Sequence, residues 1–332
     1  MKKPILYLLL LLSTHFLSAQ GTLTFSPSVP SVTNGIVDFT FDLVGGGAEY
    51  DLLVEASFDN GTNWDAIPAA DINGQLNNVA PGNISLQWDA MASFTGQVTN
   101  DAVLRVTARH VCGSDFEFEY NGTEVTYGTV LIDYGGSIGE RCWMDRNLGA
   151  EPMPFVPADD ATGSSDTRLY GDLFQWGRLD DGHQEKTSTT TSTLSVSDVP
   201  GHGEFIATST SGSSDWRDDN NDNRWNADPQ DNNPCPSGWR VPTEAELDTE
   251  RQDWSPNTSI VGAYSSALKW PLGGRRGGTG GAVSLMGDQA RVWSSSVAGT
   301  QARCMVIQNN DAFMSSGARA VGMSVRCIRN IE

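Results

Sequence analysis

The chain has 332 residues, of which 38% are hydrophobic and 19% charged, and its formal net charge at pH 7 is −20. This composition is typical of a globular protein and argues against a disordered one. The acidity argues against nucleic acid and anionic lipid as partners, because a negative surface repels phosphate groups. The length predicts two domains, since one hydrophobic core rarely serves about 300 residues.

Residues 1–19 have the pattern of a secretory signal peptide. The positive start MKK is followed by the apolar run PILYLLLLLSTHFL and by the small residues of SAQ. A membrane anchor is the alternative, but the apolar run is shorter than the ~20 residues of a spanning helix. We expect cleavage near Ala19, which removes Lys2 and Lys3 and brings the net charge to −22. The sequence therefore predicts an exported protein without a transmembrane segment.

Residues 20–113 predict an all-β sandwich. Hydrophobic residues alternate with polar ones, and turn signals such as DNGTNW (59–64) separate the segments. We expect Trp64 and Trp88 to fill the core between the two sheets. The stretch SFDNGTNW resembles the strand–turn–Trp hairpin of immunoglobulin-like and fibronectin-like modules of secreted bacterial proteins. The alternating segments are VDFTFDLV (37–44), DLLVEASF (51–58), NISLQWDA (83–90) and AVLRVTAR (102–109).

After a predicted linker at 114–126, residues 127–332 have a different character. Eight of the ten tryptophans lie in this segment, among many glycine, asparagine, aspartate and serine residues. The low-complexity stretches 187–198 and 273–281 predict loops, and the second lacks the Lys-Ser or Lys-Thr of a phosphate-binding loop. Thr243 and Glu246 form a capping box that predicts a helix through EAELDTERQDW (244–254), with Leu247 and Trp254 on its buried side.

The five cysteines are candidates for disulfide bonds rather than zinc ligands. An exported protein meets an oxidising environment, and none of the cysteines are spaced as Cys-x-x-Cys. Because five is an odd number, one cysteine can remain unpaired. Cys235 lies just upstream of the predicted helix and is a candidate nucleophile, metal ligand or disulfide partner.

Five motifs between residues 125 and 330, given in chain order at the end of this paragraph, resemble one family of secreted bacterial domains, the Fibrobacter succinogenes major paralogous domain. The resemblance covers about 200 residues and implies an α+β, C-type-lectin-like fold related to the formylglycine-generating enzyme. It also implies a surface-exposed, adhesive role behind a sandwich module, on the outer surface of a Gram-negative bacterium or in its medium. The motifs are VTYGTVLIDYGGSIGERCWMDRNLGA (125–150), YGDLFQWGRLDDGHQ (170–184), NPCPSGWRVPTEAEL (233–247), VWSSSV (292–297) and GMSVRCIRN (322–330).

The resemblance also implies a disulfide between Cys235 and Cys327, because lectin-like folds commonly join the first helix to the final strand. Such a bond would close a loop of about 90 residues and contribute up to ~4–5 kcal/mol. Cys142 has two candidate partners, Cys112 and Cys304. We favour Cys112, which would tie the sandwich to the second domain.

Catalysis has weak support in the sequence. His183 has Asp180 and Asp181 beside it, which could orient an imidazole, although a loop histidine bonded to its own backbone is far more common. A formylglycine-generating oxidase needs two cysteines close in sequence near the C-terminus. Cys304 in QARCMVIQ has no such neighbour. We therefore expect no catalytic residues and keep this oxidase as the alternative function.

The stretch DWRDDNNDNRWN (215–226) carries the candidate ligand site. Asp218, Asn220 and Asp222 alternate as the first ligands of a calcium loop do, but Asn223 and Pro229 stand where an EF-hand needs glycine and glutamate. An EF-hand is therefore excluded, and calcium is the one possible cofactor, held by a looser site. The alternative is that this acidic stretch is a solvated loop without a bound ion. The candidate ligand-binding residues are Trp216, Asp218, Asp219, Asp222 and Trp225.

Exposed indoles at Trp216 and Trp225 would stack on a sugar while the carboxylates take its hydroxyls, although tryptophan is also a common core residue. We expect Trp143, Trp176, Trp239 and Trp293 to be core. The sequence thus predicts a secreted or cell-surface binding and adhesion module that recognises a glycan or a protein. A structural component of a surface appendage is a further alternative.

Overall fold

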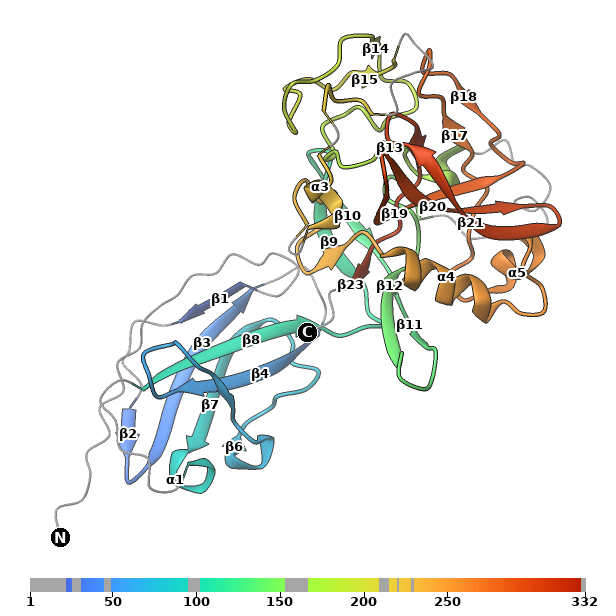
Figure 1. Ribbon diagram of the computed structural model, residues 1–332. Helices are drawn as coiled ribbons and strands as arrows, with labels where there is room; N and C mark the ends of the chain where they lie inside the picture. The colour runs from blue at the N-terminus through green and yellow to red at the C-terminus, as the bar shows by residue number, and fades with distance from the viewer. Residues whose placement is uncertain are drawn as a thin grey trace. The chain divides into compact units, whose positions relative to one another are not determined.

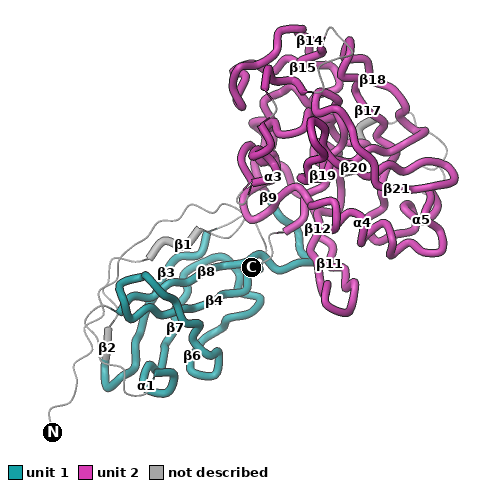
Figure 2. The backbone as a smooth tube through the Cα atoms, in the orientation of Figure 1, with its two compact units in different colours: residues 1–117 teal, residues 118–332 magenta. Residues whose placement is uncertain are grey.

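The structure is a computed structural model that describes residues 22–25, 31–44, 49–94, 102–152, 167–208, 215–219, 221–227 and 230–329. The chain divides into two compact units, residues 1–117 and 118–332 (Figure 2). Strands dominate both units, and the helices are few and short (Figure 1). In the part of the chain that is described, the helices are too short or too polar to cross a membrane. The predicted signal peptide, residues 1–19, lies outside the described residues.

The first unit contains two antiparallel sheets around one hydrophobic core. One sheet has the order β1-β3-β7-β6, with β2 also paired to β3, and the other has the order β5-β4-β8. The helical turn η1 (Ala69–Asp71) directly precedes β6, and the short helix α1 (Ala90–Ser93) directly follows β7. The strands are β1 (Thr22–Phe25), β2 (Ser31–Thr33), β3 (Ile36–Val44), β4 (Tyr50–Ser57), β5 (Asp65–Ala66), β6 (Ile72–Asn73), β7 (Gly82–Asp89) and β8 (Val103–His110).

The alternation in the sequence builds this core, as predicted. Successive side chains of a strand point to opposite faces, so every second residue of β3 faces inward. Phe39 and Phe41 pack with Val54 of β4 and Leu104 of β8 in the same cluster. The two sheets therefore meet through the hydrophobic positions that the sequence marks.

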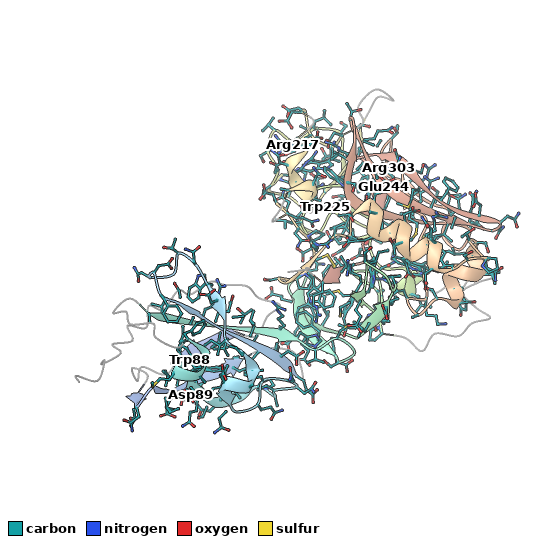
Figure 3. The ribbon with its side chains drawn as sticks, turned by 60° about the horizontal axis from the view of Figure 1, so that its bottom comes forward. Trp88, Asp89, Arg217, Trp225, Glu244 and Arg303 are labelled. Carbon is teal, nitrogen blue, oxygen red and sulfur yellow. A yellow bond between two sulfur atoms is a disulfide. The ribbon has the colours of Figure 1, made fainter. Side chains whose placement is uncertain are left out.

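The two tryptophans of the first unit have different roles. Trp88 is buried in the core, and its indole Nε1 donates to Ser93 Oγ at 3.0 Å. Asp89 follows it and caps α1 by accepting from the backbone of Met91 and Ala92 (Figure 3). Trp64, however, is only half-buried, and the guanidinium of Arg105 lies 4.3 Å from its ring. The prediction that Trp64 fills the core is wrong, because its indole lies beneath a charged side chain instead.

The predicted linker at 114–126 is largely a β-hairpin. Strands β9 (Phe116–Tyr120) and β10 (Thr123–Tyr127) pair as a two-stranded sheet, with Asn121 and Gly122 at positive φ in the turn. The division between the units falls at residue 117, within β9 and four residues after the predicted end of the sandwich. The alternation of Phe116, Phe118 and Tyr120, all buried, is the signal of a strand that the linker prediction overlooked.

The second unit contains four further small sheets. Their orders are β11-β12-β23-β16, β13-β22-β17-β18, β19-β20-β21 and the parallel pair β14-β15. The last strand, β23, lies between β12 and β16, so the two ends of this unit meet in one sheet. The strands are β11 (Thr129–Asp133), β12 (Glu140–Met144), β13 (Phe174–Gln175), β14 (Thr190–Thr191), β15 (Phe205–Ile206), β16 (Trp239–Arg240), β17 (Arg275–Arg276), β18 (Val283–Ser284), β19 (Ala290–Ala298), β20 (Gln301–Gln308), β21 (Asp311–Ala318), β22 (Gly322–Met323) and β23 (Ile328–Arg329).

The predicted helix is α4 (Glu244–Asp253), and its capping box is present: Thr243 Oγ1 accepts from the Glu246 backbone, while the Glu246 carboxylate accepts from the Thr243 backbone. Leu247 and Trp254 are buried, as predicted, in a core shared with β19 and β20. Figure 1 shows α4 lying across the β19-β20-β21 sheet. The other helical elements are η2 (Thr167–Tyr170), α3 (Asn223–Asn226) and α5 (Ile260–Ser265).

Two predicted loops contain short strands. The stretch 187–198 includes β14, and the glycine-rich stretch 273–281 includes β17, which pairs with both β18 and β22. Low complexity predicts turns well, but it misses two-residue strands whose pairing partners are distant in sequence. Trp143, Trp176, Trp239 and Trp293 are all buried, as predicted.

Candidate functional site

Cys235 is one end of a disulfide. Its sulfur is bonded to that of Cys327, with 5.8 Å between the two Cα atoms. Cys327 directly precedes β23, and Cys235 lies in the loop that leads through β16 to α4. The bond therefore fixes the approach to the helix against the last strand. A disulfide sulfur is neither a nucleophile nor a metal ligand, so Cys235 is a structural brace.

Cys304 is the free cysteine, and Cys112 and Cys142 are both disulfide-bonded. The Cys304 thiol is buried on β20, and burial raises its pKa to about 11 despite the nearby Arg291 and Arg303. Since the thiolate is the reactive form of cysteine, we expect little reaction of this thiol at neutral pH.

Trp216 and Trp225 are fully buried, which corrects the expectation that they expose their indoles to a ligand. The indole nitrogen of Trp216 donates to the backbone oxygen of Trp176 at 2.7 Å, and that of Trp225 donates to Asn232 at 2.8 Å. Both indole N–H groups therefore have a hydrogen-bond acceptor within the protein. The two rings support the overlying loops instead of contacting a ligand.

Three buried arginines lie against the rings of Trp176 and Trp216. Arg178, Arg224 and Arg319 are 0% exposed. The Arg224 guanidinium lies 5.2 Å from the Trp176 ring and 4.8 Å from the Trp216 ring, and that of Arg319 lies 4.6 Å from Trp176. Such cation–π contacts strengthen when they are removed from water. Gly177, at φ 82°, makes room for them, since a Cβ there would lie 2.8 Å from Arg224 Cδ.

One carboxylate joins two of these arginines. Asp215 Oδ2 accepts from Arg224 Nη2 at 2.5 Å and from Arg319 Nη1 at 3.4 Å. Asp222 takes a second hydrogen bond from Arg319. A buried charge is tolerated only when it is paired and hydrogen-bonded, so Asp215 is required to keep the guanidinium groups in the interior.

Two loops pack on this buried network, residues 194–199 and 215–219, which we call the paired-loop surface, and Asp215 and Trp216 belong both to the second loop and to the network. The backbone of Ser195 donates to Trp216 at 3.1 Å, and that of Asp218 donates back to Ser195 at 3.0 Å. Arg217 adds ion pairs to Asp198 and Asp219. Figure 3 shows Arg217 and Trp225 in the same region of the second unit. The loops are thus held to each other and to the core.

The paired-loop surface exposes hydrophobic side chains. Val196 is 79% exposed and Val199 58% exposed, although the neighbouring Leu194 packs against Ile206 and Trp216. The exposed Asp218 has no side-chain partner among the described residues. The surface therefore offers two apolar contacts and one carboxylate on a backbone that the network below keeps fixed.

The structure describes two of the three predicted calcium ligands, Asp218 and Asp222. Asn220 lies outside the described residues, and Asp222 is bonded to Arg319, whose charge it helps to neutralise. Binding of a cation by Asp222 would remove one acceptor from the buried Arg319 guanidinium. In the residues that the structure describes, no three acidic, histidine or cysteine side chains are grouped to hold a metal ion.

His183 is held in its neutral form. Asp181 Oδ1 lies 2.6 Å from Nδ1, and the backbone N–H of Gln175 donates to Nε2 at 3.0 Å. Nε2 is therefore an acceptor, and Nδ1 carries the proton. Burial lowers the pKa of His183 to about 4. Asp181, rather than Asp180, orients the ring, and the buried imidazole has both nitrogens engaged.

The sequence contains a signal for this network that our predictions did not use. Tryptophan and arginine stand next to or near each other in WGR (176–178), WR (216–217) and RW (224–225). The carboxylate that joins two of the arginines is 104 residues from Arg319, so the pairing itself is a property of the fold. No family model, characterised protein or solved structure matches this chain.

Proposed function

We propose that this protein is a secreted or cell-surface binding module whose second unit contacts an extracellular ligand, in the first instance a glycan, through the paired-loop surface. In this proposal the first unit is an immunoglobulin-like module, and the second is a lectin-like member of the Fibrobacter succinogenes major paralogous domain family. The observation that carries it is the pair of exposed valines, Val196 and Val199, on loops that a buried network holds in place.

The positions of the motifs support a division between framework and binding loops. The tryptophans of four motifs, Trp143, Trp176, Trp239 and Trp293, are buried. The Cys235–Cys327 disulfide joins one of these motifs, 233–247, to the fifth motif, 322–330. The paired-loop surface falls between these motifs in sequence. Loops that a rigid scaffold presents are the usual place for binding residues.

The chemistry of the surface suits a sugar. The apolar face of a sugar ring packs on aliphatic side chains, and a free carboxylate such as Asp218 accepts hydrogen bonds from hydroxyl groups. Because Arg217 is paired to Asp198 and Asp219, the loops should change little in shape on binding. A rigid surface loses less conformational entropy when it binds.

The test is a glycan array probed with the full chain, once in calcium and once in chelator. The variant Val196→Asp/Val199→Asp should lose the signal, because it places charges where apolar contacts are needed. The matched control is Val261→Asp, which changes a valine of α5 that is 61% exposed. A signal that the control loses equally, or that both variants keep, would place binding elsewhere.

The comparison of calcium with chelator also shows whether ligand binding requires calcium. A signal lost in chelator would support a calcium site around Asp218, whereas a signal that is indifferent to chelator would remove calcium from the proposal. If the folded protein binds nothing on the array, the hypothesis of a glycan ligand is refuted, and a protein becomes the expected partner. Assembly into long head-to-tail oligomers in solution would favour the structural component of an appendage.

The alternative is an oxidase of the formylglycine-generating type. That chemistry needs a reactive cysteine pair, and four of the five cysteines are disulfide-bonded. Cys304 is buried with a raised pKa. These observations favour binding over catalysis as the role of the second unit.

A further inference from the structure

Two arginines lie side by side where β17 approaches β19. Gly274 and Ala290 form a parallel bridge, so the next residues along each strand, Arg275 and Arg291, are neighbours. Figure 1 shows β17 close to the β19-β20-β21 sheet. The glycine-rich stretch that the sequence marks as a loop is thus a strand that brings one arginine against another.

Neither arginine has an acidic partner among the described residues. Among the described residues, the Arg275 side chain has no hydrogen-bond partner, and that of Arg291 makes one long contact, 3.5 Å from its Nη2 to Gln289 Oε1. Asp288 and Asp311, the acidic residues nearest in sequence, form no ion pair with either. By contrast, Arg224 is bonded to Asp215. In a chain of net charge −20, two adjacent unpaired arginines are unusual.

The pair is unfavourable as it stands. Arg275 and Arg291 are half-buried, and the Nε of each is shielded from solvent without an acceptor. A shielded donor without an acceptor is unfavourable, because it loses its hydrogen bond to water and gains none in the protein. Burial lowers the pKa of Arg291, and the charge of Arg275 lowers it further. Within the described part of the chain, no carboxylate therefore neutralises these two guanidinium groups or accepts from their Nε donors.

The surroundings extend the pair into a small polar surface. On one face of the sheet, Arg291, Val306 and Phe313 form a row across β19, β20 and β21. The next row carries Gln308, whose side-chain oxygen lies 3.4 Å from Gln289 Nε2, and the exposed Asp311, which pairs with Gln308 across the ladder. Phe313 is partly exposed. Amide groups and an aromatic edge thus lie next to the two positive charges.

We propose that Arg275 and Arg291 form a binding site for an oxyanion, a carboxylate or sulfate group carried by a ligand or free in solution. Two guanidinium groups offer parallel N–H donors that match the oxygens of such a group. Gln289 and Gln308 would contact hydroxyl or amide groups beside the anion. This site is separate from the paired-loop surface and does not depend on the function proposed for it.

The experiment uses the full chain and two probes. Equilibrium dialysis measures binding of radiolabelled sulfate at constant ionic strength, and titration calorimetry measures binding of trigalacturonate, with maltotriose as the uncharged sugar. Arg275→Gln and Arg291→Gln should each weaken anion binding at least tenfold. The matched control is Arg141→Gln, which removes the same charge from a half-buried arginine that donates to the Glu140 backbone.

The outcomes distinguish a specific anion site at Arg275 and Arg291 from nonspecific attraction of anions to any arginine. Binding of both anions, weakened in the paired variants and unchanged in Arg141→Gln, supports the proposal and identifies a carboxylated sugar as a ligand. Sulfate binding alone supports a site for the free ion. The proposal is overturned if neither anion binds at 10 mM or if Arg141→Gln weakens binding as much as the paired variants. Circular dichroism of each variant verifies folding, and a misfolded Arg291→Gln leaves Arg275→Gln to decide.

Discussion

Replacement of Asp215 by asparagine should destabilise the second unit severely. Asparagine keeps the shape and one acceptor but removes the charge, so Arg224 and Arg319, both 0% exposed, would lose the carboxylate that they share. An uncompensated buried charge costs about 3–5 kcal/mol. The total stability of a domain is only about 5–15 kcal/mol. With a urea dependence of about 2 kcal/mol per molar, the midpoint should fall by ~2 M.

Tryptophan fluorescence during urea unfolding measures this change, because eight of the ten tryptophans lie in the second unit. Asp219→Asn is the matched control, since Asp219 is 57% exposed and pairs with Arg217 at the surface. That pair contributes about 0–1 kcal/mol. If Asp215→Asn lowers the midpoint no more than Asp219→Asn does, the buried network does not hold the loops and the reasoning is refuted.

Three further predictions concern the cysteines and one buried carboxylate. Replacing Cys235 and Cys327 together by alanine should cost about 4–5 kcal/mol, since their separation of 92 residues closes a long loop; an unchanged guanidinium midpoint would contradict this. Thiol titration with an aromatic disulfide should find no reactive group in the native protein at pH 7 and one, Cys304, after unfolding; a native reaction would contradict its burial. Burial raises the pKa of Asp172 to about 6, although Tyr120 donates to it at 2.8 Å. The folded state thus favours the protonated carboxyl, and this stabilisation, full below about pH 4, is lost as the pH rises through 6. Asp172→Asn should therefore gain stability relative to the wild type between pH 5 and pH 7.5, by at most ~3 kcal/mol, and a difference independent of pH would refute the raised pKa.

The sequence predicts those parts of the fold that depend on local patterns. The alternation in β3 and the capping box of α4 involve residues that are close in the chain, and both are present in the structure. Trp64 shows where such patterns are insufficient. Its neighbours predict a strand and a turn, but only the pairing of β4 with β8 brings Arg105 over its ring.

The candidate site was harder to predict for the same reason. Trp216 and Trp225 occur in a polar, acidic stretch, which favours an exposed position, yet both are buried. The guanidinium of Arg178, from a distant segment, lies 5.4 Å from the Trp216 ring, and Trp225 packs against Trp176. The charge of Asp215 looks like part of a solvated run in the sequence. In the fold it lies between two guanidinium groups. Composition predicts how much charge a segment carries. Contacts with distant segments decide whether the charged side chains are exposed to solvent or buried.

The most direct test of the binding function is hydrogen exchange of the full chain with and without the glycan that gives the strongest array signal. The backbone amides of Ser195 and Asp218, which join the two loops, are the reporters. We predict slower exchange in 194–199 and 215–219 and no change in α5. Protection that leaves both loops unaffected and appears in another segment would contradict the paired-loop surface as the ligand site.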